Sequence, residues 1–139
     1  MKNKVGLVFG GGGGKGAYQI GVWRALREAC IDSKIDAIAG TSIGALNGAL
    51  FCMGDLAKAE KVWAAISPEQ VLTKQDIHDY CEALLYYEKG ACEDGWFSNA
   101  GLRELIDNNI RPNILKHGPR DFYVTAAKLK KSPLFYNYV

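Results

Sequence analysis

Residues 5–9 of the chain, Val5-Gly6-Leu7-Val8-Phe9, form a short apolar run that ends in five consecutive glycines, Gly10 to Gly14. Such a run predicts a buried strand that enters a tight loop. From Gly16 onward apolar residues recur at helical spacing, beginning with Ile20 and Trp23. The chain is therefore predicted to open with a strand, a glycine loop and a helix.

A second strand and helix follow at once. Ile35 to Ala39 is an apolar strand, and Gly40-Thr41-Ser42-Ile43-Gly44 turns the chain directly into a helix from Ile43 to Met53. That helix has little polar face, so we expect it to be nearly buried. Strand, helix, strand and helix within about 50 residues predict a βαβ unit with a parallel sheet.

A row of small residues runs along the first helix at intervals of four: Ala17, Gly21, Ala25 and Ala29. Small residues on one face allow a helix to approach a sheet closely. We expect this row to lie against the sheet.

Helices and a hairpin are predicted for the rest of the chain. The helices run from an Asp55 cap to Ile66, from Thr73 to Lys89, and from a Ser98 or Asn99 cap to Ile110, with Gly90 to Gly95 as a turn. Asp121 to Leu129 and Leu134 to Val139, separated by Lys130-Lys131-Ser132-Pro133, resemble the two strands of a hairpin.

Length and composition favour one domain, spanning residues 1–139. The chain is 48% hydrophobic and carries 17 Lys and Arg against 15 Asp and Glu, a net charge of +2. This balance gives no strong positive electrostatic field that would attract nucleic acid, so no nucleic-acid partner is predicted. The apolar run Val5 to Phe9 is too short for a signal peptide, and Ile43 to Met53 is too short for a membrane span. We expect a cytoplasmic protein that can contact a membrane only at its periphery.

The cysteines lie far apart, with no C-x-x-C pair and no histidine cluster nearby: Cys30, Cys52, Cys81 and Cys92. They are predicted to be reduced, buried thiols, and no metal site is predicted.

The glycine loop lies between a strand and a helix, where backbone N–H groups form an anion site. A nucleotide P-loop is excluded, because its first glycine would fall on Phe9 and its hydroxyl residue on Gly16. A dinucleotide fingerprint also expects an acidic residue at the tip of the second strand. That tip is Gly40-Thr41-Ser42, and Asp36 lies at the opposite end of the strand.

Ser42 is the candidate nucleophile. Gly40-Thr41-Ser42-Ile43-Gly44 fits G-x-S-x-G, in which a serine occupies a sharp turn between a strand and a helix. The two loops end neighbouring parallel strands and should face each other at the carboxyl edge of the sheet. Ser42 would attack an ester carbonyl while the N–H groups of Gly11, Gly12, Gly13 and Gly14 bind the oxyanion.

These residues resemble the patatin-like phospholipase family. Its G-G-G-x-[KR]-G pattern corresponds to Gly11 through Lys15 and Gly16, and its G-T-S-x-G-A motif corresponds to Gly40 through Gly44 and Ala45. The later segments Trp96 to Leu102 and Tyr123 to Ala126 also resemble family elements. The resemblance implies a three-layer α/β/α fold with a parallel central sheet and flanking helices. It also implies hydrolysis of lipid acyl esters by a Ser-Asp dyad, without histidine, metal or cofactor.

The aspartate of that dyad is not found. The family places it in a D-G-[GA] motif downstream of the hairpin region, and the only Asp-Gly pair here is Asp94-Gly95, which precedes that region. Asp94 is better explained as a surface turn. Neither His78 nor His117 lies in a catalytic setting, which disfavours an α/β-hydrolase triad. We therefore expect an incomplete domain whose C-terminal, Asp-containing segment is missing and which is inactive alone.

Other interpretations remain open. The chain can be a non-catalytic module that binds an anion or nucleotide through the glycine loop, or a subunit completed by another chain. Lys15 can pair with a lipid phosphate, although contacts to neighbouring carbonyls are favoured. The acyl chain, the head group and the oligomeric state are not defined by the sequence.

Overall fold

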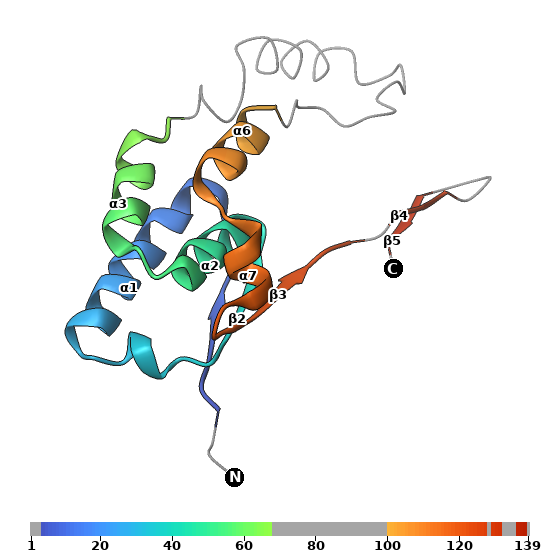
Figure 1. The fold of residues 1–139 in the computed structure, drawn as a ribbon. Coiled ribbons are helices and arrows are strands. Elements are labelled where there is room, and N and C mark those ends of the chain that lie inside the picture. The colour runs from blue at the N-terminus through green and yellow to red at the C-terminus, as the bar shows by residue number, and fades with distance from the viewer. Residues whose placement is uncertain (1–3, 68–99, 128, 132–135, 139) are drawn as a thin grey trace. The chain divides into compact units, whose positions relative to one another are not determined.

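The computed structural model describes residues 4–67, 100–127, 129–131 and 136–138. The helix predicted from Thr73 to Lys89, the turn that follows it and the caps at Ser98 or Asn99 lie outside these residues. Figure 1 shows the described elements in chain order. They are β1 (Gly6–Phe9), the 3-10 helix η1 (Gly13–Gly16), α1 (Ala17–Glu28), the 3-10 helix η2 (Asp32–Lys34), β2 (Ala37–Thr41), α2 (Ile43–Met53), α3 (Leu56–Ala65), α6 (Ala100–Asn109), α7 (Pro112–His117), β3 (Asp121–Thr125), β4 (Leu129–Lys131) and β5 (Tyr136–Tyr138).

The chain divides into two compact units. One comprises Met1–Glu60 with Arg111–Val139, and the other comprises Lys61–Ile110. The first unit holds the parallel sheet, and α6 belongs to the second. That the whole chain is a single, incomplete domain stays a prediction.

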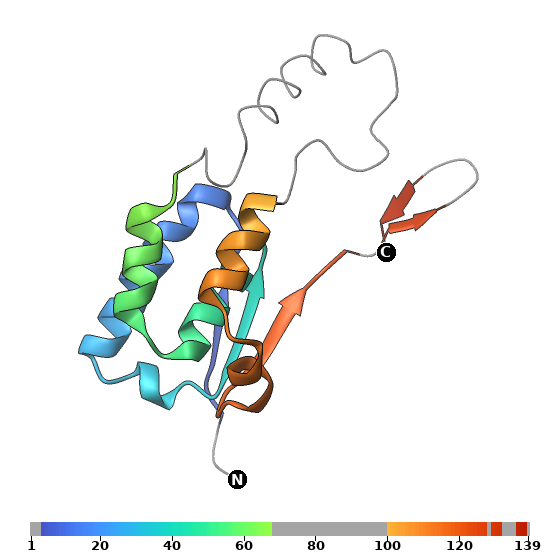
Figure 2. The same ribbon diagram turned by 45° about the horizontal axis from the view of Figure 1, so that its top comes forward.

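A three-stranded parallel sheet in the order β1-β2-β3 forms the centre of the first unit. Its register places Phe9 opposite Gly40 and Gly40 opposite Val124, so the three strands end at one edge. Helix α2 packs against all three strands (Figures 1 and 2). The predicted α/β fold with a parallel central sheet and flanking helices is confirmed.

The core lies between α2 and the sheet, as the nearly unbroken apolar sequence of α2 predicted. Phe51 on α2 is buried, and its ring centroid lies 4.8 Å from that of Trp23 on α1. Burying a side chain of this kind contributes roughly 1.5–3 kcal/mol. Gly48 lets α2 lie close, because a Cβ atom there would be 2.9 Å from Ile38 Cγ2 and 3.0 Å from Phe122 Cε2.

Helix α1 packs through a different face from the one predicted. The small-residue row Ala17, Gly21, Ala25 and Ala29 is exposed. The buried positions are Gln19, Ile20 and Trp23, and α1 contacts α2 through this side of the helix. The prediction was wrong because a helix also packs closely through large side chains, and here Trp23 fills the space against Phe51.

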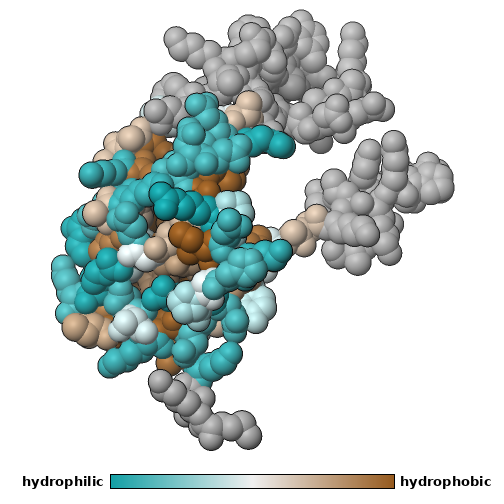
Figure 3. All heavy atoms as spheres, in the orientation of Figure 1, coloured by the Kyte–Doolittle hydropathy of each residue, from teal (hydrophilic) through white to brown (hydrophobic). Residues whose placement is uncertain are grey.

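The opposite face of the sheet is exposed in the described residues. Val8 and Tyr123 are 73% and 60% exposed, and both occupy the same cross-strand row as Ala39. Figure 3, in the orientation of Figure 1, shows the surface on the side of α2 and α7, where the described residues are mostly hydrophilic with hydrophobic residues between them. In this part of the chain no helix combines the length and apolar character needed to cross a bilayer.

Strand β2 is shifted two residues toward Ser42 from its predicted position. Gly40 and Thr41, expected in the turn, pair with Val124 and Thr125 of β3. Ile35 and Asp36 instead follow the 3-10 helix η2. The strand therefore continues up to the serine, and the change of direction occurs at Ser42 itself.

The last third of the chain differs from the sequence analysis in two places. Pro112 starts α7, a helix that was not predicted, and a proline in the first turn of a helix loses no hydrogen bond. Asp121–Thr125 was expected in a hairpin but pairs with β2 in parallel. A hairpin does form, between Leu129–Lys131 and Tyr136–Tyr138.

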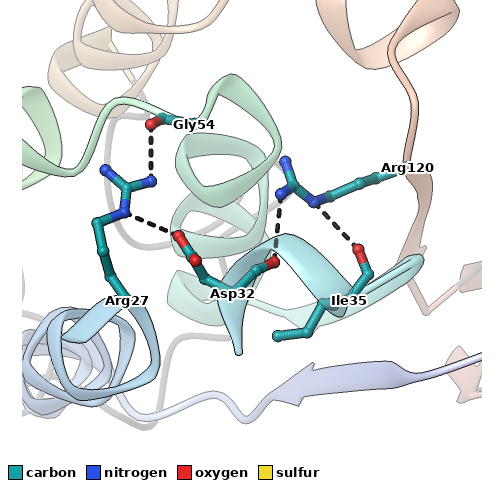
Figure 4. A network of polar contacts seen from close by, with 5 residues as sticks. All are labelled: Arg27, Asp32, Ile35, Gly54 and Arg120. Atoms are coloured by element: carbon teal, nitrogen blue, oxygen red, sulfur yellow. Dashed lines mark hydrogen bonds and ion pairs between the residues drawn. The ribbon is translucent and has the colours of Figure 1, made fainter. Parts of the chain in front are cut away.

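An arginine network fixes the amino edge of the sheet (Figure 4). Arg27 Nε donates to Asp32 Oδ2 at 2.8 Å, and Arg27 Nη2 donates to the Gly54 carbonyl at 3.0 Å. Arg120 donates to the carbonyls of Ile35 (3.2 Å) and Asp32 (3.3 Å). The hydrogen bond from Arg27 lowers the pKa of Asp32. The ends of α1 and α2 and the start of β3 are thereby tied to one another.

The two cysteines among the described residues differ in exposure. Cys52 is buried as predicted, and burial raises the pKa of its thiol to about 11. Cys30 is exposed, contrary to the prediction. It occupies the left-handed position after α1 (φ 55°), where its N–H donates to Arg27 O and the N–H of Ile31 donates to Leu26 O. This helix-ending motif places its left-handed residue on the surface, a role usually taken by glycine.

Candidate active site

The glycine loop and Ser42 lie side by side at the carboxyl edge of the sheet. The loop follows β1 and Ser42 follows β2, and these parallel strands are neighbours. A Cβ atom on Gly11 would lie 3.4 Å from Ser42 Cβ and 3.4 Å from the Thr41 carbonyl oxygen. Two motifs that are far apart in the sequence thus lie next to each other.

Ser42 has an uncommon backbone conformation for a residue with a side chain. Its φ is 53° and its ψ is −126°. Such conformations cost about 1–3 kcal/mol and persist only where the surrounding structure holds them. Ser42 stands at the N-cap position of α2, yet within the described residues its hydroxyl caps no backbone N–H of the helix. An exposed serine in this conformation fits a nucleophile turn better than a helix cap.

Gly40 and Gly44 make the turn sterically possible. A Cβ atom on Gly40 would lie 2.5 Å from Ala45 Cα and would collide with the Gly44 carbonyl. One on Gly44 would lie 2.6 Å from the Gly10 carbonyl oxygen and would collide with the carbonyl of Phe9. Both glycines are therefore required for α2 to start directly against the ends of β1 and β2.

The glycine loop is exposed and two of its residues have positive φ, Gly12 at 150° and Gly13 at 55°. The N–H of Lys15 donates to the Gly12 carbonyl at 3.2 Å and begins η1. In the part of the chain that the structure describes, the N–H groups of residues 11–14 donate no hydrogen bond to another backbone group. They remain available to an anion.

Lys15 is exposed at the end of this loop. Among the described residues its ammonium group makes no hydrogen bond and no ion pair. The contacts to neighbouring carbonyls that the sequence favoured are therefore not found. Gly16, the last residue of the motif, is buried.

Two buried amides behind the loop were missed by sequence reasoning. Gln19 Nε2 donates to the Gly10 carbonyl at 2.8 Å. Asn47 Nδ2 donates to the Gly16 carbonyl at 3.0 Å and to Gln19 Oε1 at 2.8 Å. The available signal was a polar residue on the apolar face of each helix.

A pair of hydroxyls lies next to the turn. Thr41 Oγ1 and Thr125 Oγ1 are 2.7 Å apart and hydrogen-bonded, where β2 and β3 end together. The end of β3 thus belongs to the same edge as Ser42.

No acid or base partner of Ser42 is found within the described residues, where its hydroxyl makes no hydrogen bond to a carboxylate or imidazole. Asp36 lies at the amino edge and accepts the Val5 N–H at 2.9 Å, which agrees with the argument against a dinucleotide site. His117 is exposed at the end of α7. Asp94 and His78 lie outside the described residues.

The described residues contain no group of three or more His, Cys, Asp or Glu side chains arranged to hold a metal ion.

Comparison with known proteins supports one family. The Patatin-like phospholipase family model matches residues 7–132. Neuropathy target esterase sws of Drosophila persimilis is 56% identical over 50 residues, 36% of this chain and 3% of that protein. Lysophospholipase nte1 of Aspergillus terreus is 64% identical over 47 residues, 34% of this chain and 3% of that protein. The chain thus spans only a small part of the length of these relatives. No solved structure matches it.

The family match includes β1, the glycine loop, the serine turn and β3, which are the elements that meet at the carboxyl edge of the sheet. Because it extends over most of the sequence, the chain belongs to the patatin-like phospholipase family.

Proposed function

We propose that this chain carries the nucleophile, Ser42, of a hydrolase that cleaves carboxylic ester bonds of lipids. The observation that carries the proposal is the position of Ser42, held at φ 53° against Gly11 of a loop whose N–H groups are free to bind an anion. A nucleophile beside preorganised donors is the arrangement that acyl transfer requires.

The proposed reaction has two steps. Ser42 Oγ forms a bond to the ester carbonyl carbon as its proton passes to a general base, and the N–H groups of Gly11 to Gly14 bind the negative oxygen. The carbon–oxygen bond to the alcohol then breaks, and the alcohol takes the proton. Water next attacks the acyl-serine, which releases the fatty acid and restores Ser42. Loss of one oxyanion donor costs about 2.7–4 kcal/mol of transition-state stabilisation.

The general base in this proposal is an aspartate outside the described residues, as the family resemblance implies. Without such a base a serine hydroxyl is a weak nucleophile. We therefore propose a Ser-Asp dyad, and expect the 139-residue chain alone to turn over slowly or not at all.

Phospholipids and lysophospholipids are the proposed substrates. The relatives bear the names neuropathy target esterase and lysophospholipase, and the family model is that of patatin-like phospholipases. Because such substrates assemble in membranes, the proposal includes contact with a membrane surface at its periphery.

A non-catalytic anion-binding module is the second candidate function. The exposed loop with Gly12 and Gly13 at positive φ favours it, since such turns bind anions without any chemistry. A module of this kind has no need for a strained serine beside the loop, which is why we rank it second.

Hydrolysis by the full natural protein tests the proposal. Release of fatty acid from lysophosphatidylcholine is measured for the wild type, Ser42→Ala and Ser33→Ala. Ser33 is an exposed serine on η2, at the other end of β2, and serves as the matched control. We expect turnover in the wild type and Ser33→Ala and a loss of at least about 1000-fold in Ser42→Ala. Turnover that survives Ser42→Ala would rule out the proposed nucleophile, and tight nucleotide binding without turnover would favour the module.

A further inference from the structure

Gln19 and Asn47 are unusual in the described core because they are uncharged polar side chains with almost no exposure. Gln19 is 3% exposed and Asn47 is fully buried. A buried amide is unfavourable unless its donors and acceptors are paired. The hydrogen-bond partners of the two side chains therefore indicate why polar residues occupy these buried positions.

These bonds join the two ends of the glycine loop. Gln19 Nε2 donates to the carbonyl of Gly10, where the loop begins, and Asn47 Nδ2 donates to the carbonyl of Gly16, where it ends. A third bond, from Asn47 Nδ2 to Gln19 Oε1, connects the two amides at 2.8 Å. One continuous chain of hydrogen bonds through Gln19 and Asn47 thus holds the loop at both ends, and we call these two side chains the clamp.

The clamp also connects the loop to the nucleophile. Asn47 lies on α2, the helix that begins immediately after Ser42, whereas Gln19 lies on α1 after the loop. The residue that holds Gly16 and the residue that would attack the substrate are therefore parts of the same short helix. Movement of one relative to the other requires breaking buried hydrogen bonds.

The clamp has a consequence for the N–H groups. The carbonyls of Gly10 and Gly16 are engaged from within the protein, so both ends of the loop are held, while the N–H groups of residues 11–14 donate no hydrogen bond to another backbone group in the described structure. Donors that are fixed before the reaction stabilise developing charge better than donors that must reorganise.

We propose that Gln19 and Asn47 are positioning residues that hold the glycine loop in register with Ser42. This inference rests on the proposed function, since it assigns the two amides a part in that reaction. Among the described residues neither side chain makes a hydrogen bond to Ser42. Their effect passes through the backbone of the loop, and small errors of placement in such sites lower rates by up to about 100-fold.

The test compares four variants of the full natural protein with the wild type. Gln19→Met and Asn47→Leu keep the approximate volume and remove the hydrogen bonds. Gln19→Glu keeps an acceptor toward Asn47 but removes the donor to Gly10. Asp55→Ala is the control, because Asp55 Oδ1 accepts the Lys58 N–H at 2.9 Å and caps α3, so its loss destabilises the fold without touching the loop.

The midpoint of unfolding is determined for each protein, and four further quantities are measured at a temperature well below it. They are kcat and KM for an ester substrate, the rate of Ser42 modification by a fluorophosphonate probe, and amide hydrogen exchange of peptides covering residues 10–16. Positioning predicts that kcat and the modification rate fall on the order of 10-fold to 100-fold in the Gln19 and Asn47 variants, with KM within about 2-fold. It also predicts faster exchange in the loop peptides. Asp55→Ala should lower only the midpoint of unfolding.

Two results would overturn the inference while the proposed function stands. One is a wild-type rate of Ser42 modification in all three Gln19 and Asn47 variants. The other is a fall in kcat and in the Ser42 modification rate in Asp55→Ala that equals the fall in the Gln19 and Asn47 variants when their midpoints of unfolding are lowered equally. That result would show that the two amides act only through the stability of the fold. If the wild-type protein neither hydrolyses the ester substrate nor reacts with the fluorophosphonate probe at Ser42, the proposed function itself fails and the inference fails with it. Unchanged loop exchange in the variants would contradict the clamp independently of any activity.

Discussion

Gly11 lies against Ser42, so closely that a Cβ atom on Gly11 would be 3.4 Å from Ser42 Cβ. The two residues belong to separate motifs and approach because β1 and β2 are adjacent parallel strands with Phe9 opposite Gly40. A parallel pair brings the loops after both strands to one edge of the sheet. The relationship therefore follows directly from the topology.

The strained backbone of Ser42 predicts that glycine at this position gives a more stable protein than alanine. Replacing Ser42 with glycine should relieve most of the roughly 1–3 kcal/mol held in its backbone, whereas Ser42→Ala retains the strain. Part of the gain is offset by the greater freedom of glycine in the unfolded chain, about 0.4–1 kcal/mol. We expect Ser42→Gly to be more stable than Ser42→Ala by about 1 kcal/mol in urea unfolding. Equal stabilities would show that the turn is not strained.

The glycines of the loop should respond differently to alanine. Gly13 has φ 55°, so Gly13→Ala should lose about 1–2 kcal/mol of folding stability. A Cβ atom on Gly14 meets open space and Gly14 has no positive φ, so Gly14→Ala should be neutral or stabilising by about 0.4–1 kcal/mol. Thermal unfolding of both variants tests this order, and a reversed order would contradict the described loop.

Gly44→Ala should destabilise the fold by about 1–3 kcal/mol or more, because its methyl group would be forced against the carbonyls of Phe9 and Gly10. Gly21→Ala is the matched control: Gly21 lies exposed in α1 with open space around it. That substitution should stabilise the protein by about 0.5–1 kcal/mol. Chemical denaturation measures both changes, and a neutral Gly44→Ala would refute the close approach of α2 to β1.

Acid should weaken the fold partly through Asp32. The hydrogen bond from Arg27 lowers the pKa of Asp32 below 3.8, so its contribution is fully present above that unfolded-state value. As the pH falls from about 4 through the lower folded-state pKa, Asp32 is protonated and the contribution is lost. The free energy of unfolding of Asp32→Asn should therefore depend less steeply on pH below 4 than that of the wild type. If the free energies of unfolding of the two proteins fall equally steeply with pH below 4, Asp32 does not have this role.

The sequence predicted the elements that strong local patterns define. The apolar run before Gly10, the G-x-S-x-G turn and the continuous apolar helix from Ile43 to Met53 were all found. The first of them, β1, was expected to be buried, but only Phe9 in it is buried. The helix cap at Asp55 was also correct, since its carboxylate accepts the Lys58 N–H. These features depend on neighbours within a few residues.

The wrong predictions concern features that depend on contacts between distant parts of the chain. Asp121–Thr125 has the composition of any edge strand, and only its pairing with β2 made it part of the parallel sheet. The exposure of the small-residue row on α1 depended on Trp23 reaching Phe51. Likewise, no local pattern revealed that Gln19 and Asn47 would meet behind the glycine loop.

Covalent labelling of the full natural protein shows whether Ser42 is the nucleophile. The protein is treated with a fluorophosphonate probe and digested, and the modified residue is identified by mass spectrometry. We expect one modified peptide, with the adduct on Ser42, and no labelling in Ser42→Ala while Ser33→Ala is labelled normally. A wild-type protein that folds and binds the lipid but leaves Ser42 unmodified, or an adduct on any other serine, would contradict the assignment of Ser42 as the nucleophile.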